Sequence, residues 1–186
     1  MKLVGTMGYT PVSILSEPIL TPEQCENIIA SYGTKAKLAG INTGKNTKVR
    51  RAQAYGVTEE KDPQLYEQII PHVLRTNDSI WEYHLAGFDR IQILKYTRGS
   101  HYDWHMDLGS GKHLSRKLSF IVGLSPADSY EGGEVFFKPG PEEKGFKIEQ
   151  GQMILFPSFI LHKVMPVTTG KRFVLVGWMR GLTPFQ

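Results

Sequence analysis

Residues 96–107 read Tyr96-Thr97-Arg98-Gly99-Ser100-His101-Tyr102-Asp103-Trp104-His105-Met106-Asp107. The last three residues place the imidazole of His105 and the carboxylate of Asp107 two positions apart. In an extended strand, residues i and i+2 point the same way and lie about 7 Å apart. One short segment could therefore give a nitrogen and an oxygen ligand to Fe(II), and a second histidine would complete a two-histidine, one-carboxylate triad. The tripeptide alone is a weak motif, and a polar turn between strands is the alternative.

The composition is that of an ordinary globular domain. The chain has 186 residues, of which 40% are hydrophobic and 22% are charged, and a chain of this length can bury a sizeable core. We therefore expect one domain over residues 1–186. The 19 glycines and 11 prolines favour many turns and short strands. The net charge of +4 permits an acidic partner without identifying one.

Cysteine use and hydropathy bear on where the protein works. The single cysteine, Cys25, excludes an intramolecular disulfide and fits a reducing compartment. No run approaches about 18 apolar residues, the length that a membrane-spanning helix requires. The first residues, Met1 to Gly5, lack the apolar core of a secretory signal. We therefore expect a cytoplasmic protein with no membrane partner.

Two helical patterns precede the motif. Thr21 as N-cap, Pro22 in the first turn and Gln24 three residues after the cap predict a helix that ends at Gly33. A second apolar periodicity covers residues 63–84, and Pro71 is expected to break or kink it, giving two helical pieces. Both helices would brace a sheet, so that helical support covers about residues 14–88.

The segment between these helices, residues 34–56, has a different character. It contains six lysines and arginines, no acidic residue, and interspersed glycine and asparagine. Such a composition predicts a mobile surface loop. The loop either is merely solvated or closes as a lid over a substrate.

From Arg90 onward the hydrophobic period changes to two. Strands are expected at 91–96, 118–124, 134–137, 145–148, 153–156, 162–164 and 172–178, separated by glycine and proline turn signals. Many short strands at this spacing indicate an antiparallel sandwich or barrel, with its core over about residues 89–180.

Two later residues could complete a site with the motif. His162 starts a late strand and could face His105 across a barrel. Ten residues later, Arg172 opens the final strand, in which it shares a face with Trp178. A buried arginine needs an anion, and its planar fork matches a carboxylate. If the histidines and Asp107 hold a metal ion, Arg172 marks where the far carboxylate of a ligand would sit.

This ordered set resembles the Fe(II)- and 2-oxoglutarate-dependent dioxygenases of the prolyl 4-hydroxylase type. The resemblance covers about residues 14–180. The matching positions are Tyr96, His105-Met106-Asp107, Lys117-Leu118-Ser119-Phe120, Glu131-Gly132-Gly133-Glu134, Phe156-Pro157-Ser158, His162, Arg172 and Trp178. The resemblance implies a mainly β fold with flanking helices around a double-stranded β-helix (jelly-roll, cupin-like) core.

The resemblance also implies roles for individual residues. The Fe(II) ligands would be His105, Asp107 and His162. The C5 carboxylate of 2-oxoglutarate would pair with Arg172, and the rest of its pocket would be formed by Tyr96, Ser119 and Trp178. The residues that face the substrate would be Tyr102 and Arg180. O2 is the other cosubstrate, and ascorbate is a candidate additional cofactor.

Several of these residues have a purely structural alternative. Tyr96 and Trp178 could be core aromatics, Ser119 a small residue in a crowded barrel, and Tyr102 part of a strand surface. His113, in a glycine-rich segment, is expected to be only a loop residue.

The resemblance implies a hydroxylase that couples decarboxylation of 2-oxoglutarate to succinate with C–H hydroxylation. Our leading interpretation is a prolyl 4-hydroxylase that acts on a peptide or protein; the alternative is a hydroxylase of a free amino acid or other small molecule. Nucleic-acid demethylation is disfavoured because the final strand, 172–178, lacks the second arginine of that branch. A non-enzymatic binding module would lack a ligand or the arginine, and all of them are present.

Overall fold

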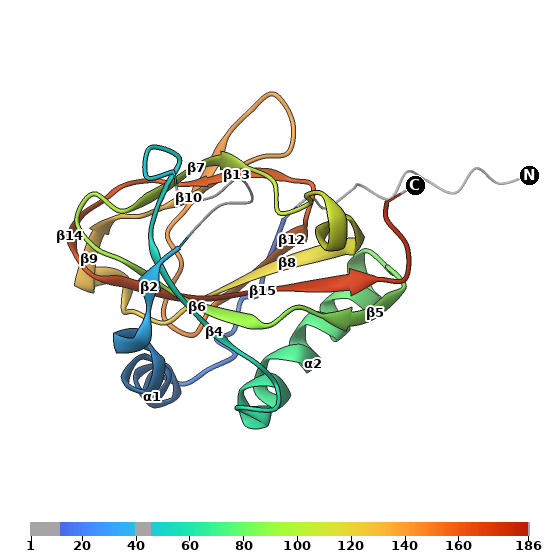
Figure 1. The fold of residues 1–186 in the computed structure, drawn as a ribbon, viewed down its shortest axis with the longest axis horizontal. Coiled ribbons are helices and arrows are strands. Elements are labelled where there is room, and N and C mark those ends of the chain that lie inside the picture. The colour runs from blue at the N-terminus through green and yellow to red at the C-terminus, as the bar shows by residue number, and fades with distance from the viewer. Residues whose placement is uncertain (1–11, 40–45, 186) are drawn as a thin grey trace, which may run out of the picture.

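The computed structural model of the chain describes residues 12–39 and 46–185. Two helices cover one face of a large antiparallel sheet, and a smaller antiparallel sheet lies over its other face (Figure 1). This mainly β fold with flanking helices and a two-sheet jelly-roll core confirms the predicted fold class.

The strands of the described residues form three sheets. The larger sheet has eight strands, β1 (Ser13–Ile14), β12 (Met153–Pro157), β8 (Arg116–Gly123), β15 (Arg172–Gly181), β6 (Ile91–Tyr96), β4 (Gln53–Val57), β2 (Lys37–Leu38) and, beside β15, β5 (Leu85–Phe88). The smaller sheet has the order β11 (Lys144–Phe146), β10 (Val135–Lys138), β13 (Leu161–Val164), β7 (His101–His105) and β3 (Arg50–Arg51). The third pairs β14 (Val167–Gly170) with β9 (Tyr130–Gly132). Short 3₁₀ turns are η1 (Gly33–Lys35), η2 (Gly111–Ser115) and η3 (Ala127–Ser129).

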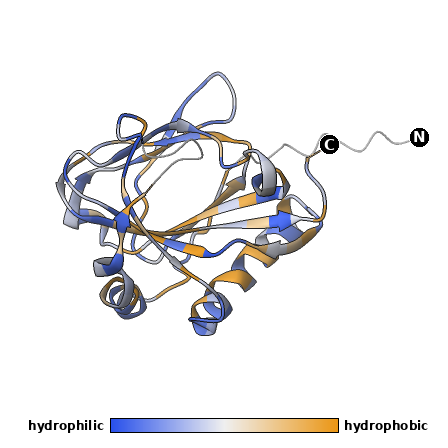
Figure 2. Cartoon of the chain, in the orientation of Figure 1, coloured by the Kyte–Doolittle hydropathy of each residue, from blue (hydrophilic) through white to orange (hydrophobic). Residues whose placement is uncertain are grey.

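Alternation along the strands of the larger sheet creates two cores. In β6, Ile91 and Ile93 pack against the helices, whereas Leu94 and Tyr96 belong to the cluster between the two sheets. Hydrophobic residues accordingly lie along these strands and on α2 where it faces them (Figure 2). Only the side chains between the two sheets can line a cavity there. Alternate residues of these strands therefore have different roles: one set packs under the helices, and the other can form a site.

The first helix, α1 (Pro22–Tyr32), begins as predicted. The Thr21 hydroxyl accepts from the Gln24 backbone N–H, and the Gln24 side chain accepts from the Thr21 N–H, which is a complete capping box. Gly33 ends the helix, but its φ of −62° is right-handed. Glycine is favoured here by close packing and not by backbone conformation, because an added Cβ would lie 2.8 Å from the Phe173 ring.

The second helix, α2 (Pro63–Ile80), runs without a break, so the predicted division at Pro71 is wrong. Pro71 lies on the exposed side, and so does Glu67, whose carbonyl loses its partner N–H and can bind water instead. Ile69 and Val73, on the opposite side, are fully buried and hold the helix on the sheet. No helix in the described part of the chain is long and apolar enough to cross a membrane.

The prediction of a mobile loop over residues 34–56 is wrong for much of the segment. β2 and β4 extend the larger sheet, and β3 forms the edge of the smaller one beside β7. The composition of the segment is that of a loop, but the free edges of β6 and β7 supply backbone hydrogen bonds that composition does not reveal. Residues 40–45 lie outside the described residues. The expected boundary near residue 89 between helical support and jelly-roll core stays a prediction.

Replacing Ile69 by alanine should lower the free energy of unfolding by about 2–5 kcal/mol, because the cavity under α2 cannot fully collapse. Leu74→Ala, on the same helix but 40% exposed, should change it by less than about 0.5 kcal/mol. Urea denaturation of both variants measures the difference. Equal losses would mean that α2 does not pack on the sheet through Ile69.

The Cys25 thiol should be unreactive in the folded protein. Its side chain is fully buried, its sulfur lies 3.8 Å from the Gly123 carbonyl oxygen, and burial raises the pKa of the thiol to about 11. Since only the thiolate attacks, about one molecule in a thousand is ionised at pH 8. A thiol reagent at pH 8 should label Cys25 only after denaturation. Rapid labelling of the native protein would contradict this placement.

Candidate active site

Three potential metal ligands converge between the sheets. His105 ends β7, Asp107 follows two residues later, and His162 lies in β13. Asp107 Oδ1 is 3.8 Å from His105 Nε2, and Asp107 Oδ2 is 3.7 Å from His162 Nε2. One ligand atom from each residue lies within 4.8 Å of the others. Two imidazole nitrogens and a carboxylate oxygen are the donor set of a facial Fe(II) site.

The strand pairing that brings these residues together differs from the one expected from the sequence. His162 does not face His105 across a barrel; the two are directly opposed on paired neighbouring strands, β13 and β7. Asp107 lies beyond the end of β7, so the expected same-face geometry of a strand does not apply to it. Its N–H donates to the Ser158 carbonyl (3.0 Å), as does the N–H of Leu108 (2.8 Å), and these bonds turn the carboxylate toward the histidines.

Hydrogen bonds to backbone carbonyls fix the tautomer of both histidines. His105 Nδ1 is 2.8 Å from the Asp103 carbonyl oxygen, and His162 Nδ1 is 2.9 Å from that of Ile160. A carbonyl only accepts, so each Nδ1 carries a hydrogen, and in the neutral imidazole each Nε2 keeps its lone pair. Both Nε2 atoms face Asp107. The imidazoles are therefore oriented for metal binding before any metal arrives.

Electrostatics favour the metal-binding forms of His105 and Asp107. Burial, followed by the neighbouring His162, lowers the pKa of His105 to about 3. Burial alone would raise the pKa of Asp107, but His162 and His105 outweigh it, so the pKa of the carboxyl lies below its usual range. At neutral pH His105 is thus neutral and Asp107 ionised, as a metal ion requires.

A buried arginine lies in the same cavity. Arg172 is 1% exposed, and its guanidinium carbon lies 5.1 Å from the centroid of the Tyr96 ring. Within the described residues its Nε and Nη1 have no hydrogen-bond partner. Gly133, with a φ of +71°, makes room for it, because an added Cβ would lie 2.8 Å from Arg172 Cδ. A buried guanidinium with two unused donors fits an incoming carboxylate.

The cavity that joins these groups has a volume of about 330 Å³. Its walls include the face of β15 predicted from the sequence, namely Arg172, Val174, Val176 and Trp178, and also Tyr96, Tyr102 and the triad. This volume is at the small end of ligand sites. The cavity can therefore take a small dicarboxylate and only the reacting part of a second molecule.

Of the other predicted site residues, Tyr102 lines the cavity, whereas Ser119 and Arg180 do not. Tyr102 lines the cavity, and its ring stacks on the His105 imidazole with centroids 3.4 Å apart. Ser119 is buried, with its hydroxyl 3.0 Å from that of Ser158, and Arg180 points to Asp89. The predicted contacts of Ser119 with a cosubstrate and of Arg180 with a substrate stay predictions. His113 was expected only in a loop, but it lies in η2 and lines the cavity.

Sequence reasoning missed several cavity residues, among them Arg50 and Arg116. Arg50 of β3 places its guanidinium carbon 4.7 Å from the Tyr102 ring centroid, on a segment that we expected to be a loop. Arg116, at the start of β8, donates through Nη1 to the Asp107 carbonyl (3.2 Å). No local signal distinguishes either from the other basic residues, since each depends on a partner distant in sequence.

Comparison with known proteins agrees with this geometry. Residues 91–180 match the family model of the 2OG-Fe(II) oxygenase superfamily. The matched residues include the triad and Arg172. A PKHD-type hydroxylase of Idiomarina loihiensis is 27% identical over 168 residues, covering 86% of this chain and 77% of the relative. Further PKHD-type hydroxylases match at 42% identity, but over less than half of their own length.

Solved structures share the fold. A Pseudomonas putida prolyl-4-hydroxylase superposes with a TM-score of 0.76 at 18% identity, covering 91% of this chain and 92% of that one. A prolyl hydroxylase from Trichoplax adhaerens, solved in complex with a hypoxia inducible factor peptide fragment, gives 0.73 at 15% identity, covering 91% and 83%. At such identities the likeness establishes the fold alone.

Proposed function

Residues 91–180 match the 2OG-Fe(II) oxygenase family model, and from this premise we propose that the protein is a 2-oxoglutarate-dependent prolyl hydroxylase that acts on a peptide or protein. One observation carries the proposal: the His105, Asp107 and His162 donors and the buried Arg172 guanidinium face one cavity. A metal centre and a carboxylate site in one small space are what this chemistry needs.

The metal would be held by Nε2 of both histidines and by the Asp107 carboxylate. Bound there, Fe(II) supplies the oxidation, in which 2-oxoglutarate, O2 and a C–H bond give succinate, CO2 and C–OH. The protein orients both imidazoles through the Nδ1–H bonds to the Asp103 and Ile160 carbonyls. Its own task is therefore ligand geometry and exclusion of water.

Arg172 would bind the C5 carboxylate of 2-oxoglutarate through its two unused donors. Its position is determined by the ring of Tyr96 beside it and the space left by Gly133. Val174 and Val176 line the cavity and would contact the apolar middle of the cosubstrate. Because the arginine is fully buried, this ion pair would form away from water, where it is strong and selective for a dicarboxylate.

A peptide would reach the cavity past Tyr102. The Tyr102 ring lies between the Arg50 guanidinium and the His105 imidazole, so it forms the wall between the metal centre and the edge strand β3. The small cavity admits one side chain of a larger substrate. The Trichoplax prolyl hydroxylase, solved in complex with a peptide fragment, is an example of this fold with a peptide bound. The cytoplasmic location and a role of ascorbate remain predictions.

A free amino acid or other small molecule is the second candidate, favoured by the same small cavity. Fe(II)-loaded protein with 2-oxoglutarate and O2 should be offered proline-containing peptides and, separately, free amino acids. Peptide-stimulated succinate formation with a mass gain of one oxygen atom on proline supports the prolyl proposal. Stimulation only by free amino acids would reject it in favour of the small-molecule alternative.

A further inference from the structure

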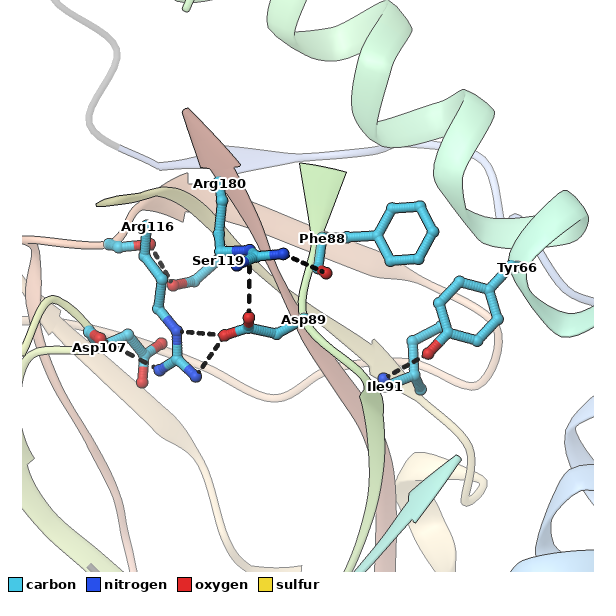
Figure 3. A network of polar contacts seen from close by, with 9 residues as sticks. Tyr66, Phe88, Asp89, Ile91, Asp107, Arg116, Ser119 and Arg180 are labelled. Atoms are coloured by element: carbon cyan, nitrogen blue, oxygen red, sulfur yellow. Dashed lines mark hydrogen bonds and ion pairs between the residues drawn. The ribbon is translucent and has the colours of Figure 1, made fainter. Parts of the chain in front are cut away.

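Asp89 connects two arginines beside the metal site. It lies in the turn between β5 and β6, and each of its carboxylate oxygens faces one guanidinium (Figure 3). Arg116 Nη2 and Nε lie 2.7 and 2.8 Å from Asp89 Oδ2. Arg180 Nε lies 3.3 Å from Asp89 Oδ1. We call Asp89, Arg116 and Arg180 the Asp89 cluster.

Arg116 connects this cluster to the site in two directions. Its third nitrogen, Nη1, donates to the carbonyl of Asp107 at 3.2 Å. The flat face of the same guanidinium lies over the indole of Trp178, with its central carbon 4.0 Å from the ring centroid. One side chain thus contacts the backbone of the carboxylate ligand and a wall of the cavity.

The Asp107 backbone depends on such bonds because it lies outside β7 and has no strand ladder to hold it. Its N–H is held by the Ser158 carbonyl. Its carbonyl is held by Arg116. With both peptide groups restrained, the carboxylate keeps its direction toward His105 and His162. Without Arg116, the Asp107 carbonyl loses this partner, and the two peptide groups beside Asp107 are held through the Ser158 carbonyl alone.

Arg116 in turn needs Asp89 to keep this pose. An arginine has a long, flexible side chain, and a guanidinium whose side chain is only 11% exposed requires an anionic partner to stay there. The two bonds to Asp89 Oδ2 fix the plane of the guanidinium, which must lie flat on Trp178 and point one nitrogen at Asp107. The Asp89 carboxylate accepts both bonds and also supplies the negative charge that the buried guanidinium needs.

We propose that Asp89 is a positioning residue of the metal centre, acting through Arg116 on the Asp107 backbone and the Trp178 indole. The inference rests on the proposed function only in taking the triad as a metal site. Arg180, whose side chain is 42% exposed, contributes less, because water can replace it at Asp89 Oδ1.

Titration calorimetry with Mn(II) alone tests the proposal without turnover. Asp89→Ala should weaken Mn(II) binding about tenfold, the usual cost of losing an outer-shell partner, and Asp89→Asn should weaken it less, since the amide oxygen still accepts. Arg180→Ala should have a smaller effect than Asp89→Ala. Asp128→Ala, an exposed carboxylate in η3, is the matched control and should bind as wild type does.

A double-mutant cycle separates positioning from general damage to the fold. In an Arg116→Ala background, Asp89→Ala should have no further effect on Mn(II) affinity, because its route to Asp107 is already lost. Wild-type affinity in Asp89→Ala, or an undiminished loss in the Arg116→Ala background, would overturn the proposal. If Asp89→Ala does not fold, Asp89→Asn carries the same cycle.

Succinate formation by the wild type reports separately on the proposed function. Mn(II) binding that depends on Asp89, without any succinate, would reject the dioxygenase activity and keep the positioning role. Failure of the wild type to bind Mn(II) would overturn both.

Discussion

Arg172→Met should abolish useful binding of 2-oxoglutarate while leaving the folded protein at least as stable as wild type. Truncating one partner of a buried, hydrogen-bonded charge pair costs about 2–5 kcal/mol, which is about 30-fold to several thousandfold in Kd. In the protein without ligand, however, no carboxylate of the described residues forms an ion pair with Arg172. Replacing that buried charge by an apolar side chain should be neutral or stabilising by up to about 4 kcal/mol.

Calorimetric titration with 2-oxoglutarate and urea denaturation measure the two effects on the same samples. Arg172→Lys keeps a charge without the planar fork and should lose less affinity. Arg98→Met, at an exposed arginine after β6, is the matched control and should change neither quantity. A large loss of stability in Arg172→Met with unchanged cosubstrate affinity would make Arg172 a structural residue.

Asp107→Ala should remove the metal centre. It deletes the carboxylate that lies 3.7 and 3.8 Å from the two histidine Nε2 atoms. Loss of an outer-shell partner alone costs up to about a hundredfold in metal affinity or activity, so loss of a ligand should cost at least that much. Mn(II) affinity and succinate formation should fall together, and both are directly measurable.

Asp103→Ala is the control for this variant. Asp103 lies in β7 two residues before His105, its side chain is exposed, and its backbone carbonyl, which orients His105, is kept in the alanine variant. It should retain metal binding and turnover. Parallel losses in both variants would point to damage of β7 rather than to removal of a ligand.

Local signals predicted the parts of the fold that depend on neighbouring residues. The capping box of Thr21 and Gln24 was readable because it needs only four consecutive residues. The period of two gave β6, β8 and β15, and the shared face of Arg172 and Trp178 does line the cavity. Pro71 misled because a proline interrupts a helix only when its missing bond is buried or its ring clashes, and here that side faces solvent.

Features that depend on distant pairing were not readable. The register that sets His162 opposite His105 is a property of β13 and β7 together. The strands of the basic segment form only on edges offered by β6 and β7. Likewise, Asp89, Arg116 and Arg180 come from three separate parts of the chain, and each alone is an ordinary charged residue. The chemistry of a metal site limits which residue types can be its ligands, so the ligands can be predicted from the sequence. The residues that hold those ligands in place depend on how the strands pair, so they cannot be predicted in this way.

Succinate formation is the most direct test of the central claim that the triad and Arg172 form an Fe(II)- and 2-oxoglutarate-dependent oxygenase site. Protein loaded anaerobically with Fe(II) and 2-oxoglutarate would be exposed to O2 and its succinate measured. We expect succinate from the wild type, and none above background from Asp107→Ala or, at limiting 2-oxoglutarate, from Arg172→Met. No succinate from a folded wild type that binds neither Fe(II) nor 2-oxoglutarate would contradict the account.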